Sequence, residues 1–149
     1  MSAIIVLDTG PLGLITNPKQ SGENLACYEW LERLVANERR VIVPELADYE
    51  VRRELLRAGK VRGLRRLDVV VSTLEYLAIS TVAMRLAASF WAQARSQGFQ
   101  TAANEALDGD VILAAQAVSL AEANVIVATT NVGHLSRFVN ASHWREIDT

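Results

Sequence analysis

Residues 4–11 read Ile-Ile-Val-Leu-Asp-Thr-Gly-Pro, an unbroken apolar run that ends on a carboxylate and a Gly-Pro turn. An apolar run without alternation is typical of a strand covered on both faces, as in the middle of a parallel sheet. Asp8 would then lie at the carboxyl end of the strand, where open α/β sheets bind their ligands. The alternative is that Asp8 only caps the following helix or begins a turn.

Apolar strands and amphipathic helices alternate along the rest of the chain. The pattern predicts short strands at 41–43, 76–79, 125–128 and near 144–147. It predicts a helical turn over 11–18, helices over 21–37, 81–97 and 111–121, two helices between Pro44 and about 71, and a polar loop over 99–107. This alternation indicates an α/β fold, a three-layer α/β/α arrangement with a central, mainly parallel sheet of about four or five strands.

Composition narrows the class of protein. At 149 residues, with 50% hydrophobic and 21% charged residues, we expect a single globular domain over 1–149. The net charge of −2 gives no global attraction to nucleic acid or to an anionic membrane, so any such contact needs a local patch. The single Cys27 excludes an intrachain disulfide and fits a reducing cytoplasm, where we expect the protein to work. The apolar segments 69–94 and 111–128 are interrupted by charged or polar residues, so neither should span a membrane.

Several polar side chains are expected on one rim of the sheet. Asp8 and Asn131 follow predicted strands, whereas Asp108 and Asp110 open a predicted helix. Because a crossover helix begins near the carboxyl end of the preceding strand, these side chains should meet there. Carboxylates gathered in this way repel each other unless a cation neutralises them. With no Cys or His cluster nearby, their hard oxygens suit Mg²⁺ or Mn²⁺.

A further acid should come from the helix that follows Pro44. Glu45, Glu50 and Glu54 are the candidates, and the last two lie one helical turn apart on the boundary of the apolar face. The sequence does not decide which of these two faces the rim.

Four segments together resemble the PIN domain family: 4–9, 43–50, 110–115 and 128–131. They occur in the family's order over essentially the whole chain, and the closest resemblance is to small single-domain members similar to VapC toxins. The resemblance implies a parallel sheet between helices, with acids that bind Mg²⁺ or Mn²⁺ and cleave RNA. It also implies an antitoxin protein partner and a homodimer.

The resemblance assigns roles to matched positions: Asp8, Glu50 and Asp110 as catalytic and metal-binding acids, Asn131 as a metal ligand where many members have Asp, and Thr9 and Thr129 as hydrogen-bonding support. Asp108 has no fixed counterpart, but it lies two residues before Asp110 and can complete the metal site. Each polar residue also has a structural explanation. Asp108 and Asp110 can cap the helix, Glu50 can form a surface ion pair, and Asn131 can be a turn residue.

The implied function is a metal-dependent endoribonuclease, the toxin of a type II toxin–antitoxin pair. One alternative is a catalytically inactive PIN-like module that binds RNA or protein, which the neutral Asn131 supports. A remote alternative is a retroviral-type aspartic protease, suggested by the Asp-Thr-Gly triplet but disfavoured by the helical pattern. Seven of the fifteen basic residues fall within 52–66, among them Arg52, Arg53 and Arg57. They are either an RNA backbone track or a surface balanced by acids, and the latter is favoured for most of them.

Overall fold

The computed structural model describes residues 2–98, 104–122 and 124–149. Within these residues, five strands form one sheet in the order β3-β2-β1-β4-β5, and all four neighbouring pairs are parallel. The strands are β1 (Ile4–Leu7), β2 (Val41–Pro44), β3 (Glu75–Leu77), β4 (Val125–Thr129) and β5 (Ala141–His143). The prediction of an α/β fold with a parallel sheet of four or five strands is confirmed.

The central strand β1 explains why its sequence is apolar at every position. It pairs with β2 on one side and with β4 on the other, and all four of its residues are buried. Helices cover both faces of such a strand, so that neither set of side chains meets water. Asp8 leaves the middle of the sheet at its carboxyl edge, where its backbone N–H donates to Ala128 at 2.9 Å.

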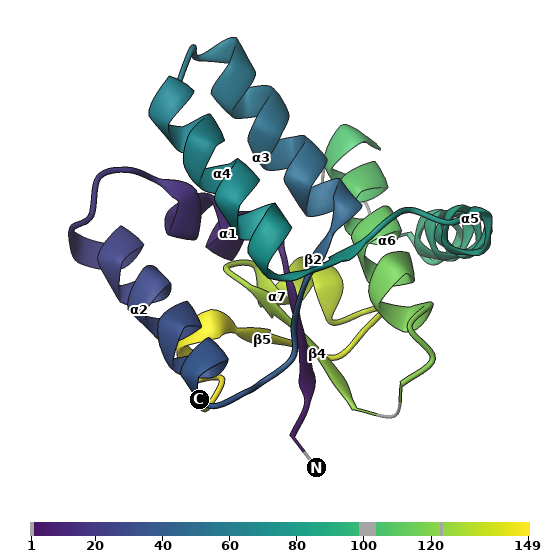
Figure 1. Cartoon of the computed structure of the whole chain (residues 1–149). Helices are drawn as coiled ribbons and strands as arrows, with labels where there is room; N and C mark the ends of the chain where they lie inside the picture. The colour runs from purple at the N-terminus through teal and green to yellow at the C-terminus, as the bar shows by residue number, and fades with distance from the viewer. Residues whose placement is uncertain (1, 99–103, 123) are drawn as a thin grey trace.

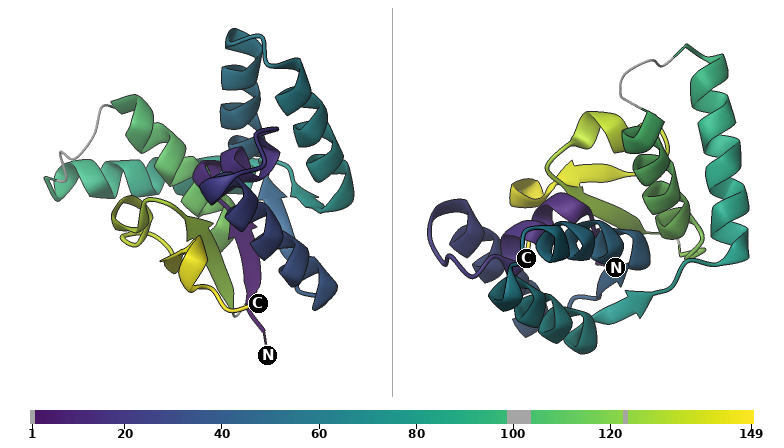
Figure 2. Two further views of the ribbon diagram at one scale, coloured as in Figure 1. Left: turned by 90° about the vertical axis from the view of Figure 1, so that its left-hand side faces the viewer. Right: turned by 90° about the horizontal axis from the view of Figure 1, so that it is seen from above.

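The helices form two layers around the sheet (Figure 1). They are α1 (Thr9–Thr16), α2 (Gly22–Ala36), α3 (Glu45–Arg57), α4 (Val61–Thr73), α5 (Thr81–Ser96), α6 (Asn104–Val118) and α7 (Val132–Leu135), with a 3-10 turn η1 (Trp144–Glu146). α1 and α2 lie on one side of the sheet, and α5 and α6 lie on the other. The α3–α4 hairpin projects beyond the carboxyl ends of the strands (Figure 2). Within the described ranges, no helix has the length and apolar character needed to cross a membrane.

The predicted boundaries around α6 were wrong. Residues 99–103 of the predicted loop lie outside the described residues, but α6 already begins at Asn104 and ends at Val118. Leu107 is buried with Ala83 and Ala87 of α5, and this packing favours helix where polar composition suggested a loop. Asp110 therefore lies inside the helix, and neither it nor Asp108 is a helix cap.

The predicted boundaries of α1, β3 and β5 also needed correction. Asp8 caps α1, so the helix begins at Thr9 and makes two turns instead of the single turn expected after Pro11. β3 ends at Leu77, because the N–H of Ile79 donates to Glu45 Oε1 at 2.7 Å instead of extending the ladder. The last strand precedes Trp144, whose ring turns inward to lie 5.7 Å from that of Trp30.

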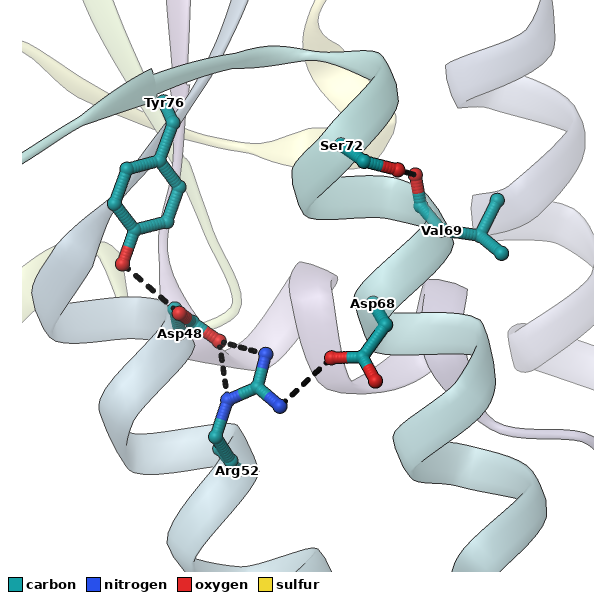
Figure 3. A network of polar contacts seen from close by, with 6 residues as sticks. All are labelled: Asp48, Arg52, Asp68, Val69, Ser72 and Tyr76. Atoms are coloured by element: carbon teal, nitrogen blue, oxygen red, sulfur yellow. Dashed lines mark hydrogen bonds and ion pairs between the residues drawn. The ribbon is translucent and has the colours of Figure 1, made fainter.

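A polar network fixes the α3–α4 hairpin to the edge of the sheet (Figure 3). Asp48 Oδ2 accepts from the Tyr76 hydroxyl at 2.9 Å, and Asp48 Oδ1 accepts from Arg52 Nε at 3.1 Å. The same guanidinium donates to Asp68 of α4 at 2.8 Å. Arg52 thus joins two helices, while Tyr76 joins α3 to β3. This network holds α3 in one orientation, and so it also holds the side chains that α3 presents to the sheet edge.

Candidate active site

Asp8 is held at the carboxyl end of β1 by two neutral donors. Its Oδ1 accepts from the backbone N–H of Thr9 and its Oδ2 from the hydroxyl of Thr129, both at 2.7 Å. Thr129 is fully buried, and its hydroxyl also accepts from the N–H of Asn131 at 2.9 Å. Asp8 is therefore a helix cap and also a fixed carboxylate on the rim, so the two alternatives for this residue are compatible.

Glu50 is the acid that α3 directs toward Asp8. Its Oε1 accepts from the Thr9 hydroxyl at 2.6 Å, so Thr9 contacts both acids. Glu54, one turn further along the helix, is exposed and forms an ion pair with Arg57. The structure thus separates the two glutamates that the sequence left as alternatives.

Two glycines allow the elements of the rim to approach closely. A Cβ on Gly109 of α6 would lie 2.8 Å from Glu50 Oε2, which shows how near α6 lies to this carboxylate. A Cβ on Gly10 of α1 would collide with the Thr130 hydroxyl at the end of β4. At both positions a side chain would occupy space that the rim already uses.

Asp110 of α6 faces the same rim and lies beside His134 of α7. Asp110 Oδ2 is 3.5 Å from His134 Nδ1, and the same nitrogen is 3.1 Å from Asn131 Nδ2. An amide nitrogen only donates and a carboxylate only accepts, so Nδ1 serves one of them at a time, according to whether it carries a proton. His134 was not among the site residues predicted from the sequence. Its position three residues after Asn131, on the next helical turn, was the signal that linked it to the rim.

The charges of the three acids act on one another. Burial raises the pKa of Asp110 to about 6, the nearby His134 opposes the rise, and the carboxylates of Asp8 and Glu50 add to it. Burial likewise raises the pKa of Asp8, against the hydrogen bonds from Thr129 and Thr9, and the charge of Glu50 raises it further. Acidic side chains from three distant parts of the sequence therefore influence one another's charge.

Asp108, which was also predicted as a metal ligand, lies away from the rim. It is exposed and lines a hollow between α5 and α6 together with Met84 and Trp91. Two residues along a helix correspond to a rotation of about 200°, so Asp108 and Asp110 point in nearly opposite directions.

The three arginines considered for RNA binding each contact an acid. Arg52 bonds Asp48 and Asp68, whereas Arg57 pairs with Glu54. Arg53 lies 3.7 Å from Glu50 Oε2 and over the ring of Tyr49. The positive charges of these three arginines are thus paired with nearby acids, as expected for a surface whose basic residues are neutralised by acidic ones.

The donor set suits a hard divalent cation. In the described part of the chain, no three or more His, Cys, Asp or Glu side chains are placed to hold a metal ion together as they stand. Mg²⁺ does not need such a cage, because proteins usually bind it through one or two carboxylates while it keeps several waters. The raised pKa values of Asp8 and Asp110 reflect burial and a local excess of negative charge, which a cation would relieve.

A parallel five-stranded sheet between helices, with acids along its carboxyl rim, is the PIN-like fold, and comparison with solved structures agrees. The chain is similar to one in the crystal structure of VapBC2 from Rickettsia felis bound to a DNA fragment from their promoter, with a TM-score of 0.74, 19% identity, and 95% of this chain and 98% of that chain covered. The chain is also similar to one in the structure of DNA-bound VapBC from Salmonella typhimurium, with a TM-score of 0.66, 22% identity, and 95% of this chain and 98% of that chain covered. For VapBC-1 from nontypeable Haemophilus influenzae, the TM-score is 0.69, the identity is 15%, and 96% of this chain and 99% of that chain are covered. No family model and no curated protein matches the chain. At these identities the likeness shows a shared fold.

Proposed function

We propose that this protein is a metal-dependent endoribonuclease that hydrolyses phosphodiester bonds in RNA. The observation that carries the proposal is the placement of three acids at the rim of a PIN-like sheet: Thr9 bonds both Asp8 and Glu50, and α6, which carries Asp110, approaches Glu50 at Gly109. Acids that are distant in sequence, partly buried and mutually repelling are costly to the fold, and such arrangements mark functional sites.

Each residue of the rim has a separate task in this mechanism. Mg²⁺ or Mn²⁺ held by Asp8 and Asp110 would supply positive charge and a water of lowered pKa. Thr129 and the N–H of Thr9 keep Asp8 in one orientation. Glu50, held by the Thr9 hydroxyl, is placed to accept a proton from the attacking water or to ligate a second cation. Attack on phosphorus with departure of the 3′ oxygen leaves a 5′-phosphate and a 3′-hydroxyl.

Asn131, which caps α7, and His134 of α7 lie beside Asp110. When Nδ1 carries a proton, His134 can donate to Asp110 and fix its orientation without being a ligand itself; when Nδ1 does not, it accepts from the Asn131 amide. The replacement of a carboxylate by Asn131 leaves three acids on the rim, enough negative charge for one or two divalent cations.

We also propose a biological setting. The three solved structures described above are VapBC complexes, which supports the toxin of a type II toxin–antitoxin pair with a protein antitoxin as partner. We expect a homodimer in the cytoplasm. Expression of the wild-type chain alone should arrest growth, and expression of the Asp8→Asn variant should not.

A PIN-like module that binds RNA without cleaving it is the second candidate, and the neutral Asn131 is the observation that favours it. The aspartic protease is not a candidate, because that fold is almost entirely β-structure and this sheet is parallel and covered by helices.

The decisive experiment sequences the 5′ ends of RNA from cells that express wild type, Asp8→Asn or Asp108→Asn. Asp108→Asn is the matched control, because it removes one carboxylate from α6 on the side away from the rim. We expect new 5′ ends with wild type and with Asp108→Asn, and none with Asp8→Asn. Purified protein should reproduce the cleavage with Mg²⁺ and lose it in EDTA. An identical cleavage profile for wild type and Asp8→Asn would refute the nuclease.

A further inference from the structure

A groove leads away from the acids. It has a volume of about 930 Å³ and begins at Thr9 and Glu50. It continues between α1 and α3, over Val51 and Leu55, to the start of α4. A smaller hollow of about 360 Å³ shares Pro18 and Arg62 with it and extends the depression along α4. Glu50 and Thr9, which also bonds Asp8, therefore lie at one end of a longer surface channel.

Five exposed cations line this channel, and one of them, Arg57, is paired with Glu54, which lies on the same wall. The other four are Lys19, Lys60, Arg62 and Arg65. Within the described residues, none of their side chains has an ion pair or a hydrogen bond to an acid, in contrast to the partnered Arg52, Arg53 and Arg57. The overall charge is −2, so these cations are a local concentration and not part of a basic surface. Among the described residues, the channel thus carries four cations without an acidic partner, against the Glu54–Arg57 pair and Glu50 on the same wall.

The arrangement of α4 makes these cations a row. Arg62 and Arg65 are three residues apart on α4 and share a face of the helix, and Lys60 precedes its first turn. Arg66, also in the smaller hollow, donates to the carbonyl of Ile15 at 2.8 Å and lies over the ring of Tyr28. Arg66 therefore fastens α4 to α1 and α2, which fixes the position of the row relative to the acids.

We propose that the backbone of single-stranded RNA binds along this channel, with its phosphates on Lys19, Lys60, Arg62 and Arg65 and its scissile bond at Asp8 and Glu50. The inference rests on the proposed nuclease function, because the channel ends at the acids that would cleave the chain. Among the described residues that line the groove, none is aromatic, so bases find no stacking platform on them. The channel contributes affinity through phosphates, and this contribution does not depend on sequence.

The test measures the binding of fluorescently labelled oligouridylate in EDTA, where cleavage is blocked, over a range of salt concentrations. The channel variants are K19Q/K60Q and R62Q/R65Q. The matched control is R33Q/R85Q, which removes two exposed arginines that do not line the channel. Each lost phosphate contact should reduce the slope of log affinity against log salt by about 0.7. Each channel pair should then bind roughly 10- to 30-fold more weakly at about 0.1 M salt, and the control should bind as wild type does.

Equal loss in the control pair, or an unchanged salt slope in both channel pairs, would overturn the proposal. Tighter channel-dependent binding of polyglutamate than of RNA at the same salt would overturn it too, in favour of an acidic protein segment. The melting temperature of each variant shows whether its fold is intact. If one of the two channel variants does not fold, the other still tests the proposal. Cleavage in Mg²⁺ is scored separately. If the channel variants bind RNA more weakly but wild type does not cleave it in Mg²⁺, the channel proposal is supported and the nuclease proposal is refuted. If wild type cleaves RNA but the channel variants bind it as tightly as wild type, the nuclease proposal is supported and the channel proposal is refuted.

Discussion

Gly109→Ala places a methyl group at a point where α6 almost touches Glu50. The added Cβ would lie 2.8 Å from Oε2 and 3.5 Å from Cδ of that carboxylate. Since ordinary van der Waals contact begins at 3.4 Å, the carboxylate must withdraw by at least about 0.6 Å. Its 2.6 Å hydrogen bond from the Thr9 hydroxyl must then lengthen or rotate.

The variant should lose activity without losing stability. A misplacement of 1 Å at a reacting group can cost about 100-fold, so a shift of about 0.6 Å should lower kcat/KM by about tenfold. Alanine is favoured over glycine in a helix interior by about 0.5–1 kcal/mol, and moving the flexible end of Glu50 costs little. The melting temperature should therefore stay the same or rise, while cleavage falls.

The assay pairs thermal unfolding with Mg²⁺-dependent cleavage of a labelled RNA. Gly133→Ala is the control, because a Cβ on this residue of α7 meets nothing within 4 Å although it adjoins His134. Full activity in the Gly109 variant would show that the position of Glu50 is irrelevant to cleavage. A large drop in its melting temperature would show instead that Gly109 serves packing.

Three further predictions concern single side chains. The folded protein holds the Asp110 proton more tightly than the unfolded chain, so wild type loses stability as pH rises from about 4 through about 6. Asp110→Asn should avoid that loss and be more stable than wild type at pH 7 without metal, by about 1–2 kcal/mol. The full pKa shift corresponds to about 3 kcal/mol, and we reduce this because 24% of the side chain is exposed to solvent. Equal denaturation midpoints of the two proteins at pH 7 would contradict this prediction. His134→Ala should raise the Mg²⁺ concentration for half-maximal cleavage about tenfold, and an unchanged titration would remove its positioning role. Tyr76→Phe should cost at most about 1 kcal/mol in urea unfolding by removing the bond to Asp48, with cleavage intact.

The parts of the fold that the sequence predicted are those fixed by local pattern. The unbroken apolar run of β1 is sufficient to place it inside a parallel sheet, and its end then places Asp8 on the rim. The choice of Glu50 over Glu54 depends on how α3 is rotated against α1, which only tertiary contacts determine. The separation of Asp108 from Asp110 followed from a helix boundary that polar composition concealed. Once both residues are inside α6, they must point to different sides.

The way each acid is held separates the proposed site from ordinary surface ion pairs. Glu75 and Glu54 receive short hydrogen bonds from arginine guanidinium groups, which hold the pKa of each below its usual range. Asp8 is held by a hydroxyl and a backbone N–H, which fix its geometry but leave its charge unneutralised, and burial raises its pKa. A fold that only needed a cap for α1 could use a neutral Ser or Asn at position 8 at little cost. A buried carboxylate placed among neutral donors and other acids therefore supports the cation proposed for this rim.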